Sequence, residues 1–309
     1  MSDFLLRITF ILHHFFSRCL NRLYSADVDI RPNLALQYCD EVMQAVLMIL
    51  ASTNESLIPR TETEGLLVIT AVVTATDDQF EKYLASAYQY IMKGVRKTDA
   101  IDVSKCAISL MGDIAQTVGE HIIPYCDDIM QLFVALVGNQ NVDRSIQLTV
   151  FTSFGSIALS VGPSFEKHLP VVMVVMRESA MVVRLPKESM DKESTDKEML
   201  AYMTELRSEI MSSYVCILSG MEENQRSDQL QPYLEGVFLV IQLVANVEED
   251  EDLMNQTVGL IGDLASAFGA REVGALINQH RESIEKCLCG SDDEELVEFC
   301  KQKVNPFFQ

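Results

Sequence analysis

Gly112-Asp113-Ile114-Ala115-Gln116-Thr117-Val118-Gly119 recurs twice more in this 309-residue chain, as Gly155–Gly162 and as Gly262–Gly269. The shared pattern is Gly-x-Ile/Leu-Ala-x-x-x-Gly, and the first two octets start 43 residues apart. Internal repetition at such a period is typical of proteins built from stacked structural repeats. The octets therefore predict an array of similar units, with function on an extended surface rather than in a buried pocket.

The octet itself predicts the end of an amphipathic helix. Ile114 and Val118 are four residues apart, as are their counterparts in the other octets, and this spacing places both side chains on one helix face. The closing glycine is expected to cap the helix in a left-handed conformation. The opening glycine lies inside the helix, where it costs about 0.5–1 kcal/mol relative to alanine. Its use three times indicates that another helix passes close by.

A second repeated feature marks the start of a preceding helix. Tyr83, Tyr125, His168 and Tyr233 occupy the same position in similar stretches, and the first three are 42 and 43 residues apart. Two helices in about 40–47 residues is the period of HEAT and armadillo repeats. The expected pairs are 35–53 with 60–77, 80–97 with 101–118, 122–137 with 142–161, 165–183 with 197–219, 230–246 with 252–268, and 271–288 with 292–305.

These patterns predict an all-α fold, a HEAT-repeat (armadillo-like) right-handed superhelical solenoid of about six helix pairs. Residues 25–309 are expected to form one continuous array, and residues 1–24 a remnant helix of a preceding repeat or a non-homologous start. The connection 185–196 is polar and is expected to be mobile. Because the apolar first residues are unlike the polar cap of a solenoid, we expect a piece, or a shortened version, of a longer array.

Composition narrows the class of partner. The net charge of −21 disfavours nucleic acid and anionic membranes, because both kinds of partner need a basic surface. The apolar stretch 4–20 is too short and too charged for a spanning helix, so no membrane insertion is expected. It favours a basic partner, although an acidic surface also serves solubility alone. The eight cysteines include no CxxC pair, so buried apolar thiols are expected rather than a metal site.

No pattern typical of catalysis or of a bound cofactor is present. The sequence lacks a glycine-rich phosphate loop, a nucleophile elbow, a metalloprotease helix and an EF-hand loop. Asp127 and Asp128 could form a paired-carboxylate site, but Asp40 and Glu41 occupy the equivalent place in another repeat, which favours a solvated helix start. We predict that the chain is not an enzyme and uses neither cofactor nor metal.

Acidic residues are the remaining candidates for recognition. Two acidic runs, 248–252 and 292–295, lie next to predicted second helices. If the second helices line the concave side of the solenoid, their carboxylates would form an acidic ladder suited to a Lys/Arg-rich helix. The alternative is that these residues are ordinary solvated faces and helix N-terminal charges.

Several stretches resemble one family. Residues 110–178 and 199–269 are similar to the C-terminal part of importin β, the karyopherin nuclear-import receptor. The resemblance is carried by Ile122–Leu132, Asn141–Ser145, Phe154–Leu159, Thr204–Arg207 and Gly259–Leu264. It covers most of this chain but only about the last third of the family's length.

The resemblance implies a function and partners. In the family these repeats wrap the basic importin-β-binding helix of importin α, so the expected partners are importin α or basic cargo segments, with Ran-GTP and phenylalanine–glycine nucleoporins as further candidates. The expected locations are the cytoplasm, the nucleus and the nuclear pore. The predicted contacts to the basic helix are Asp113, Asp143, Glu205, Glu209, Asp252, Asp263, Glu294, Glu298 and Phe299.

Two departures from the family matter. The N-terminal repeats that carry its principal Ran site have no counterpart here, and Phe299 stands where the family has a tryptophan that stacks on the basic helix. A phenylalanine can still stack on a cation, with a weaker cation–π interaction. The alternative function is a HEAT scaffold subunit of another complex, such as a phosphatase, because repeat physics alone does not choose a partner.

Overall fold

The protein is built from helices and turns. This computed structural model describes residues 32–51, 59–181, 192–223, 225–247, 250–269 and 271–308, and these residues include no strand. The predicted all-α class is confirmed. The chain divides into two compact units, Met1–Ser153 and Phe154–Gln309. The predicted start at residues 1–24 lies outside the described residues.

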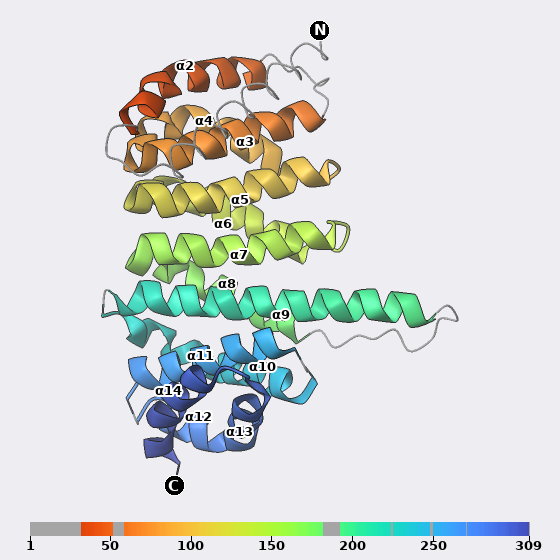
Figure 1. The fold of residues 1–309 in the computed structure, drawn as a ribbon, viewed down its shortest axis with the longest axis vertical. Helices are drawn as coiled ribbons and strands as arrows, with labels where there is room; N and C mark the ends of the chain where they lie inside the picture. The colour runs from red at the N-terminus through yellow and green to blue at the C-terminus, as the bar shows by residue number, and fades with distance from the viewer. Residues whose placement is uncertain are drawn as a thin grey trace. The chain divides into compact units, whose positions relative to one another are not determined.

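The helices follow one another in pairs along the chain (Figure 1). The α-helices are α2 (Pro32–Ala51), α3 (Pro59–Thr76), α4 (Glu81–Val95), α5 (Ile101–Val118), α6 (Ile123–Gly138), α7 (Arg144–Val161), α8 (Leu169–Ala180), α9 (Lys192–Glu222), α10 (Leu234–Val247), α11 (Glu251–Ala267), α12 (Gly274–Gln279), α13 (Arg281–Gly290) and α14 (Glu294–Val304). The 3₁₀ helices are η1 (Asp77–Phe80), η2 (Gly119–Ile122), η3 (Gly162–His168), η4 (Ser227–Tyr233) and η5 (Asn305–Phe307).

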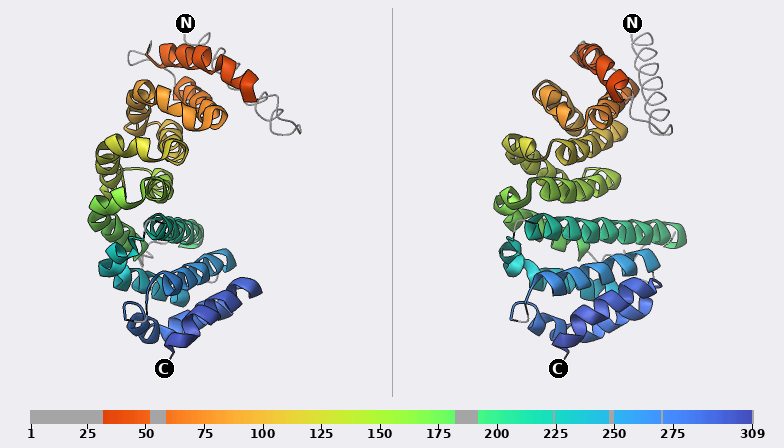
Figure 2. Two further views of the ribbon diagram at one scale, coloured as in Figure 1. Left: turned by 90° about the vertical axis from the view of Figure 1, so that its left-hand side faces the viewer. Right: turned by 60° about the vertical axis from the view of Figure 1, so that its left-hand side comes forward.

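Within each unit the helices form two layers. In the first unit α2 packs against α4, while α3 packs against α5. In the second unit α8 packs against α10 and α10 against α13, while α9 packs against α11 and α11 against α14. The first helices of the pairs thus contact first helices, and the second helices contact second helices, as Figure 2 shows for each unit. This is the stacking expected of HEAT-type repeats.

The first helix of most pairs begins later than predicted. A 3₁₀ turn precedes α4, α6, α8 and α10, and each turn carries one apolar residue into the core: Phe80, Ile122, Phe165 and Leu230 are all buried. The tighter winding of a 3₁₀ turn turns this side chain inward before the α-helix starts. The first helix of the last pair, predicted as 271–288, is divided into α12 and α13 at His280.

Helix α9 is longer than predicted. It begins at Lys192, so residues 192–196 are helical although they were expected to belong to a mobile connection. Residues 185–191 lie outside the described part of the chain. The predicted apolar stripe of α9 is confirmed, because Met203, Leu206, Ile210, Tyr214 and Ile217 are all buried.

The octets end helices, as predicted, but their closing glycines differ. Gly119 and Gly162 have positive φ angles of +56° and +50°. Gly119 combines this φ with a ψ of −130°, which lies outside the left-handed helical region and is open to glycine because it lacks a Cβ. The expected left-handed cap is therefore wrong at Gly119, and it is also wrong at Gly269, because α11 ends through Phe268 in an extended conformation.

The cysteines of the described residues are reduced. Cys39, Cys126, Cys287 and Cys300 are buried, as predicted. Burial raises the pKa of both Cys287 and Cys300 to about 12, which keeps these thiols protonated and unreactive. Cys289 is exposed, and Cys106 and Cys216 are partly exposed, so the prediction of buried thiols is wrong for these three.

Among the residues that the structure describes, one stretch is long and apolar enough to span a membrane. It is Arg144–Ala180, and 61% of its most apolar window is buried inside the protein. The stretch comprises α7, η3 and α8. The core helices of a water-exposed repeat protein have the same composition, because their apolar faces pack against neighbouring helices.

Candidate functional site: acidic faces of the second helices

Two octets carry an aspartate at the same position, and both carboxyls are partly desolvated. Burial raises the pKa of Asp113 on α5, and burial together with the nearby Glu222 raises the pKa of Asp263 on α11. Among the described residues, no hydrogen bond or ion pair joins either carboxyl to a cation. A lysine or arginine from a partner would therefore stabilise the ionised form of each carboxyl.

An aromatic side chain lies beside the second of these octets. Phe299 on α14 is 39% exposed, and its ring covers Gly262, the residue before Asp263. A Cβ added at Gly262 would lie 2.7 Å from Cε1 of Phe299. The predicted close approach at the opening glycine is therefore confirmed in this octet. It places an exposed ring on the same turn of α11 as a desolvated carboxyl.

The ring of Phe299 already has a cation nearby. The Nζ atom of Lys303 lies 5.5 Å from the ring centroid, one helical turn further along α14. This distance is within the range of a cation–π contact. A cation from a partner that stacked on the same ring would compete with Lys303.

Asp143, another predicted contact, has a local role at the start of α7. Its Oδ1 accepts hydrogen bonds from the backbone N–H of Ser145 at 2.9 Å and from the hydroxyl of Ser145 at 2.6 Å. These bonds lower the pKa of Asp143. Asp250 and Asp293 act similarly, since they accept from the backbone N–H groups of Leu253 and Leu296. All three aspartates cap second helices.

The structure brings some of the other predicted residues together. Glu205 and Asp252 line one groove. Glu294 and Glu298 are exposed on α14, the helix that carries Phe299, and Glu298 accepts a hydrogen bond from Gln302 at 3.3 Å. Glu209 is half-buried on α9, one turn beyond Glu205. The predicted ladder thus has members on three second helices of the second unit, namely α9, α11 and α14.

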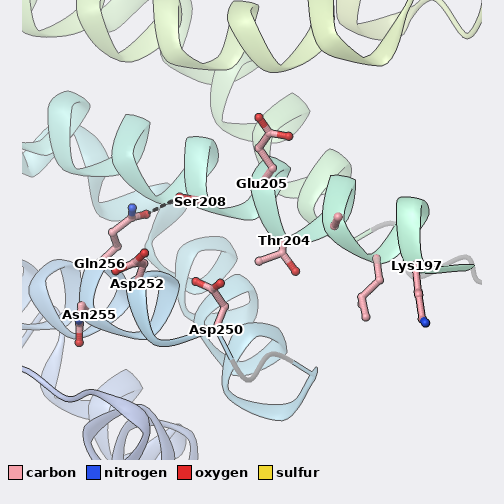
Figure 3. Close-up of a pocket in the computed structure, with 10 residues that line it drawn as sticks. Lys197, Thr204, Glu205, Ser208, Asp250, Asp252, Asn255 and Gln256 are labelled. Carbon is pink, nitrogen blue, oxygen red and sulfur yellow. Dashed lines mark hydrogen bonds between the residues drawn. The ribbon is translucent and has the colours of Figure 1, made fainter.

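The groove lies between the first half of α9 and the start of α11 (Figure 3). Its volume is about 1170 Å³. It is lined by Lys197, Leu200, Ala201, Thr204, Glu205, Ser208, Asp250, Asp252, Asn255 and Gln256. The hydroxyl of Ser208 donates to Oε1 of Gln256 at 3.0 Å and joins the two helices at one end.

Sequence reasoning missed the groove and several of its residues. Leu200, Asn255 and Gln256 were not candidates, because an exposed leucine and two amides carry no signal for a basic partner. The available signal was the spacing of Lys197, Ala201, Thr204 and Ser208, which repeats every three or four residues opposite the buried stripe of α9.

The fold and the repeat spacing define a class of protein. Stacked helix pairs in two layers, with a 42–43-residue period, characterise the HEAT and armadillo type of helical-repeat protein. A computationally designed armadillo-repeat protein superposes on 87% of this chain with a TM-score of 0.59 and 14% identity.

The family follows from the sequence. Residues 27–288 match the family described as importin subunit beta-1-like, TPR repeats, and the chain belongs to this family. Importin subunit beta-1 of Schizosaccharomyces pombe is 28% identical over 255 residues, which cover 79% of this chain and 28% of that protein. The Arabidopsis thaliana protein of the same name is 26% identical over 275 residues, which cover 87% of this chain and 30% of the relative.

Solved structures share the fold. A crystal structure of importin beta obtained in polyethylene glycol matches 99% of this chain with a TM-score of 0.75 and 22% identity, and this chain covers 39% of it. A Kap95:Nup1 complex matches with the same TM-score and 19% identity. The chain therefore spans less than a third of the length of the curated relatives and less than half of these structures.

Proposed function

We propose that this chain is the adaptor-binding part of a nuclear import receptor and that it binds a basic helix such as the importin-β-binding helix of importin α. Membership of the importin subunit beta-1-like family supports this function over that of a phosphatase scaffold. The proposal rests on the surface of α11 and α14 around Asp263. There the carboxyl of Asp263, which has no cationic partner among the described residues, lies near the exposed ring of Phe299.

The chemistry of this surface fits a lysine- or arginine-rich helix. An arginine beside Asp263 would compensate for the partial burial of the Asp263 carboxylate and for its repulsion from Glu222. A second cation could stack on Phe299. The net charge of −21 would also accelerate the encounter with a basic partner, and salt would weaken this attraction.

The proposal extends to the other partners of the family. For phenylalanine–glycine nucleoporins, the supporting feature is an apolar row on α8 and at its end, where Val171, Val174 and Met181 are 49%, 37% and 40% exposed. Their spacing of three and seven residues puts them on one helix face. Ran-GTP binding and movement between cytoplasm and nucleus rest on family membership alone.

The test is a titration of the full chain with a fluorescent peptide that spans the basic helix of importin α, followed by anisotropy. We expect binding at low salt that weakens steeply between about 50 and 200 mM salt. Asp263→Asn should weaken binding about tenfold, which corresponds to about 1.4 kcal/mol. Absence of binding at low salt by a chain that circular dichroism shows to be folded would refute the proposal.

The matched control is Asp143→Asn. It removes the same charge, and asparagine caps a helix nearly as well as aspartate does, so the fold is preserved. We expect less than a twofold change in affinity. Equal losses from both variants would mean that the total charge, rather than the surface around Asp263, controls binding.

A further inference from the structure

The first half of α9 extends beyond the helix on which it packs. Helix α9 has 31 residues and α11 has 17. The hydrogen bond between Ser208 and Gln256 fixes their register, and both helices begin on the same side of it (Figure 3). Sixteen residues of α9 precede Ser208, whereas α11 begins only five residues before Gln256. At 1.5 Å per residue, α9 therefore continues about 16 Å past the start of α11.

Within the described residues, this overhang carries an apolar residue past the start of α11. One turn before the Ser208–Gln256 bond, Thr204 on α9 and Asp252 on α11 line the groove. One turn further toward the N-terminus of α9, Leu200 lines the groove at a level that α11 does not reach, because α11 begins only at Glu251. Leu200 is 53% exposed, although a leucine of a second helix normally packs against the next repeat. The groove thus has an exposed leucine on its α9 side and carboxylates at the start of α11.

The acidic side of the groove is the start of α11. Asp250 uses Oδ1 to cap the helix, and Asp252 is exposed in the first turn. Figure 3 shows Asp250 and Thr204 directed toward the space between the two helices, whereas Glu205 points away from α11. The negative charge that faces the groove is therefore supplied mainly by Asp250 and Asp252, while Lys197 contributes a positive charge from α9.

We propose that this groove holds a partner segment that places an apolar side chain over Leu200 and a lysine or arginine against Asp250 and Asp252. The inference rests on the proposed function for the basic character of the partner, and it adds an apolar requirement. Leu200 and Thr204 are separated by about 6 Å, one helical turn. A helical partner would therefore carry its apolar residue three or four positions from its cation.

The experiment compares two helix-forming peptides of identical composition. In the paired peptide, a leucine and an arginine are four residues apart on one face; in the other peptide, the leucine is moved to the opposite face. Both are titrated into the full chain at low salt and followed by fluorescence anisotropy. We expect the wild type to bind the paired peptide about fivefold more tightly. Leu200→Ser and Asp252→Asn should each reduce this preference to less than twofold.

The control variant is Glu198→Gln, which removes an exposed charge from the same helix outside the groove. It should retain the fivefold preference. Asp250 is left intact, because its loss would uncap α11. If the wild type binds the importin-α helix but shows no preference between the two peptides, or if Leu200→Ser keeps the preference, the groove proposal is wrong. Failure to bind the importin-α helix would instead overturn the proposed function.

Discussion

The octets of α7 and α11 have the same opening glycine, but the atom nearest to a Cβ at that position belongs to the backbone in one octet and to a side chain in the other. A Cβ added at Gly155 would lie 3.0 Å from Cα of Ser213 in the backbone of α9. A Cβ added at Gly262 would meet the ring of Phe299, which is part of a half-exposed side chain. Both octets therefore lie where two second helices meet, but only at Gly262 is the nearest neighbour the ring of a half-exposed side chain.

The residue at the second position of the octet also differs between α7 and α11. Ser156 follows Gly155 on α7, whereas the desolvated Asp263 follows Gly262 on α11. The glycine and apolar positions of the octet thus serve packing in each copy. Under the proposed function, the residue at the second position distinguishes the copy that would bind a cation. This comparison can be tested by changing each octet separately.

The largest expected effect is on stability, from Gly155→Ala. The new methyl group would also meet Oγ of Ser213 at 3.1 Å and Cβ of Cys216 at 3.2 Å. Overpacking of this kind costs about 1–3 kcal/mol, and the gain in helix propensity offsets up to about 1 kcal/mol. We expect a net loss of about 1–2 kcal/mol in urea denaturation.

Gly262→Ala is the matched comparison. The ring of Phe299 can move toward solvent, so the stability should change by less than about 1 kcal/mol. The displaced ring should then weaken binding of the basic peptide. Equal stability losses from the two variants would show that the octets are equivalent, against the distinction drawn above.

The next largest effect is on stability and tests whether Asp143 acts as a helix cap rather than through its charge. Asp143→Ala removes both hydrogen bonds to Ser145 and should cost about 1 kcal/mol of stability. Asp143→Asn should cost only a few tenths of that amount, since the amide oxygen can still accept from the backbone N–H. Denaturant titrations of both variants provide the measurement. A loss from asparagine as large as that from alanine would imply that Asp143 acts through its charge.

Much of the fold could be predicted from the octets because helix periodicity and glycine spacing are local properties. The buried stripe of α9 and the close packing at Gly155 and Gly262 both follow from such spacing. The 3₁₀ turns were not predicted, because no residue type marks a 3₁₀ turn in the sequence. Each turn instead accompanies the burial of one apolar side chain, such as that of Phe165. The extended end of α11 at Phe268, which is buried, was likewise not predicted.

The site was less predictable because sequence identifies charge but not solvation. Asp143 and Asp263 look alike in the sequence, yet hydrogen bonds lower the pKa of the first and burial raises that of the second. The groove depends on the relative lengths of α9 and α11. The start of α9 at Lys192 extends a helix into a segment whose polar composition indicates a loop.

A smaller effect concerns the cation that already lies near the ring of Phe299. Lys303→Met should raise the affinity for the basic peptide about twofold more than Lys301→Met does, because only Lys303 competes for the ring. Both variants remove one positive charge from α14, so their general electrostatic effects match. Anisotropy titrations at one salt concentration measure the difference. Identical affinities for the two variants would place the partner's cation away from Phe299.

The smallest expected effect is a pH-dependent gain of stability in Asp263→Asn. Burial and Glu222 raise the folded-state pKa of Asp263 above its unfolded value, which is about 3.9. Above both pKa values, the folded state therefore holds a carboxylate in a less favourable environment than the unfolded state does, and stability is reduced. Below the unfolded pKa, both states are protonated and this cost disappears. The carboxylate also lies near the C-terminus of α11, where a negative charge opposes the helix dipole.

Asp263→Asn should accordingly raise the Tm by about 1 °C at pH 7, a gain of a few tenths of a kcal/mol. The gain should vanish at about pH 3, below the unfolded pKa. Differential scanning calorimetry of the wild type and the variant at both pH values measures the difference. A Tm at pH 7 that is lower in the variant would mean that Asp263 makes a stabilising contact within the folded chain. A higher Tm combined with weaker peptide binding would mean that Asp263 destabilises the fold but binds a cation of the partner. The Gly155 octet has Ser156 at this position and no such carboxylate.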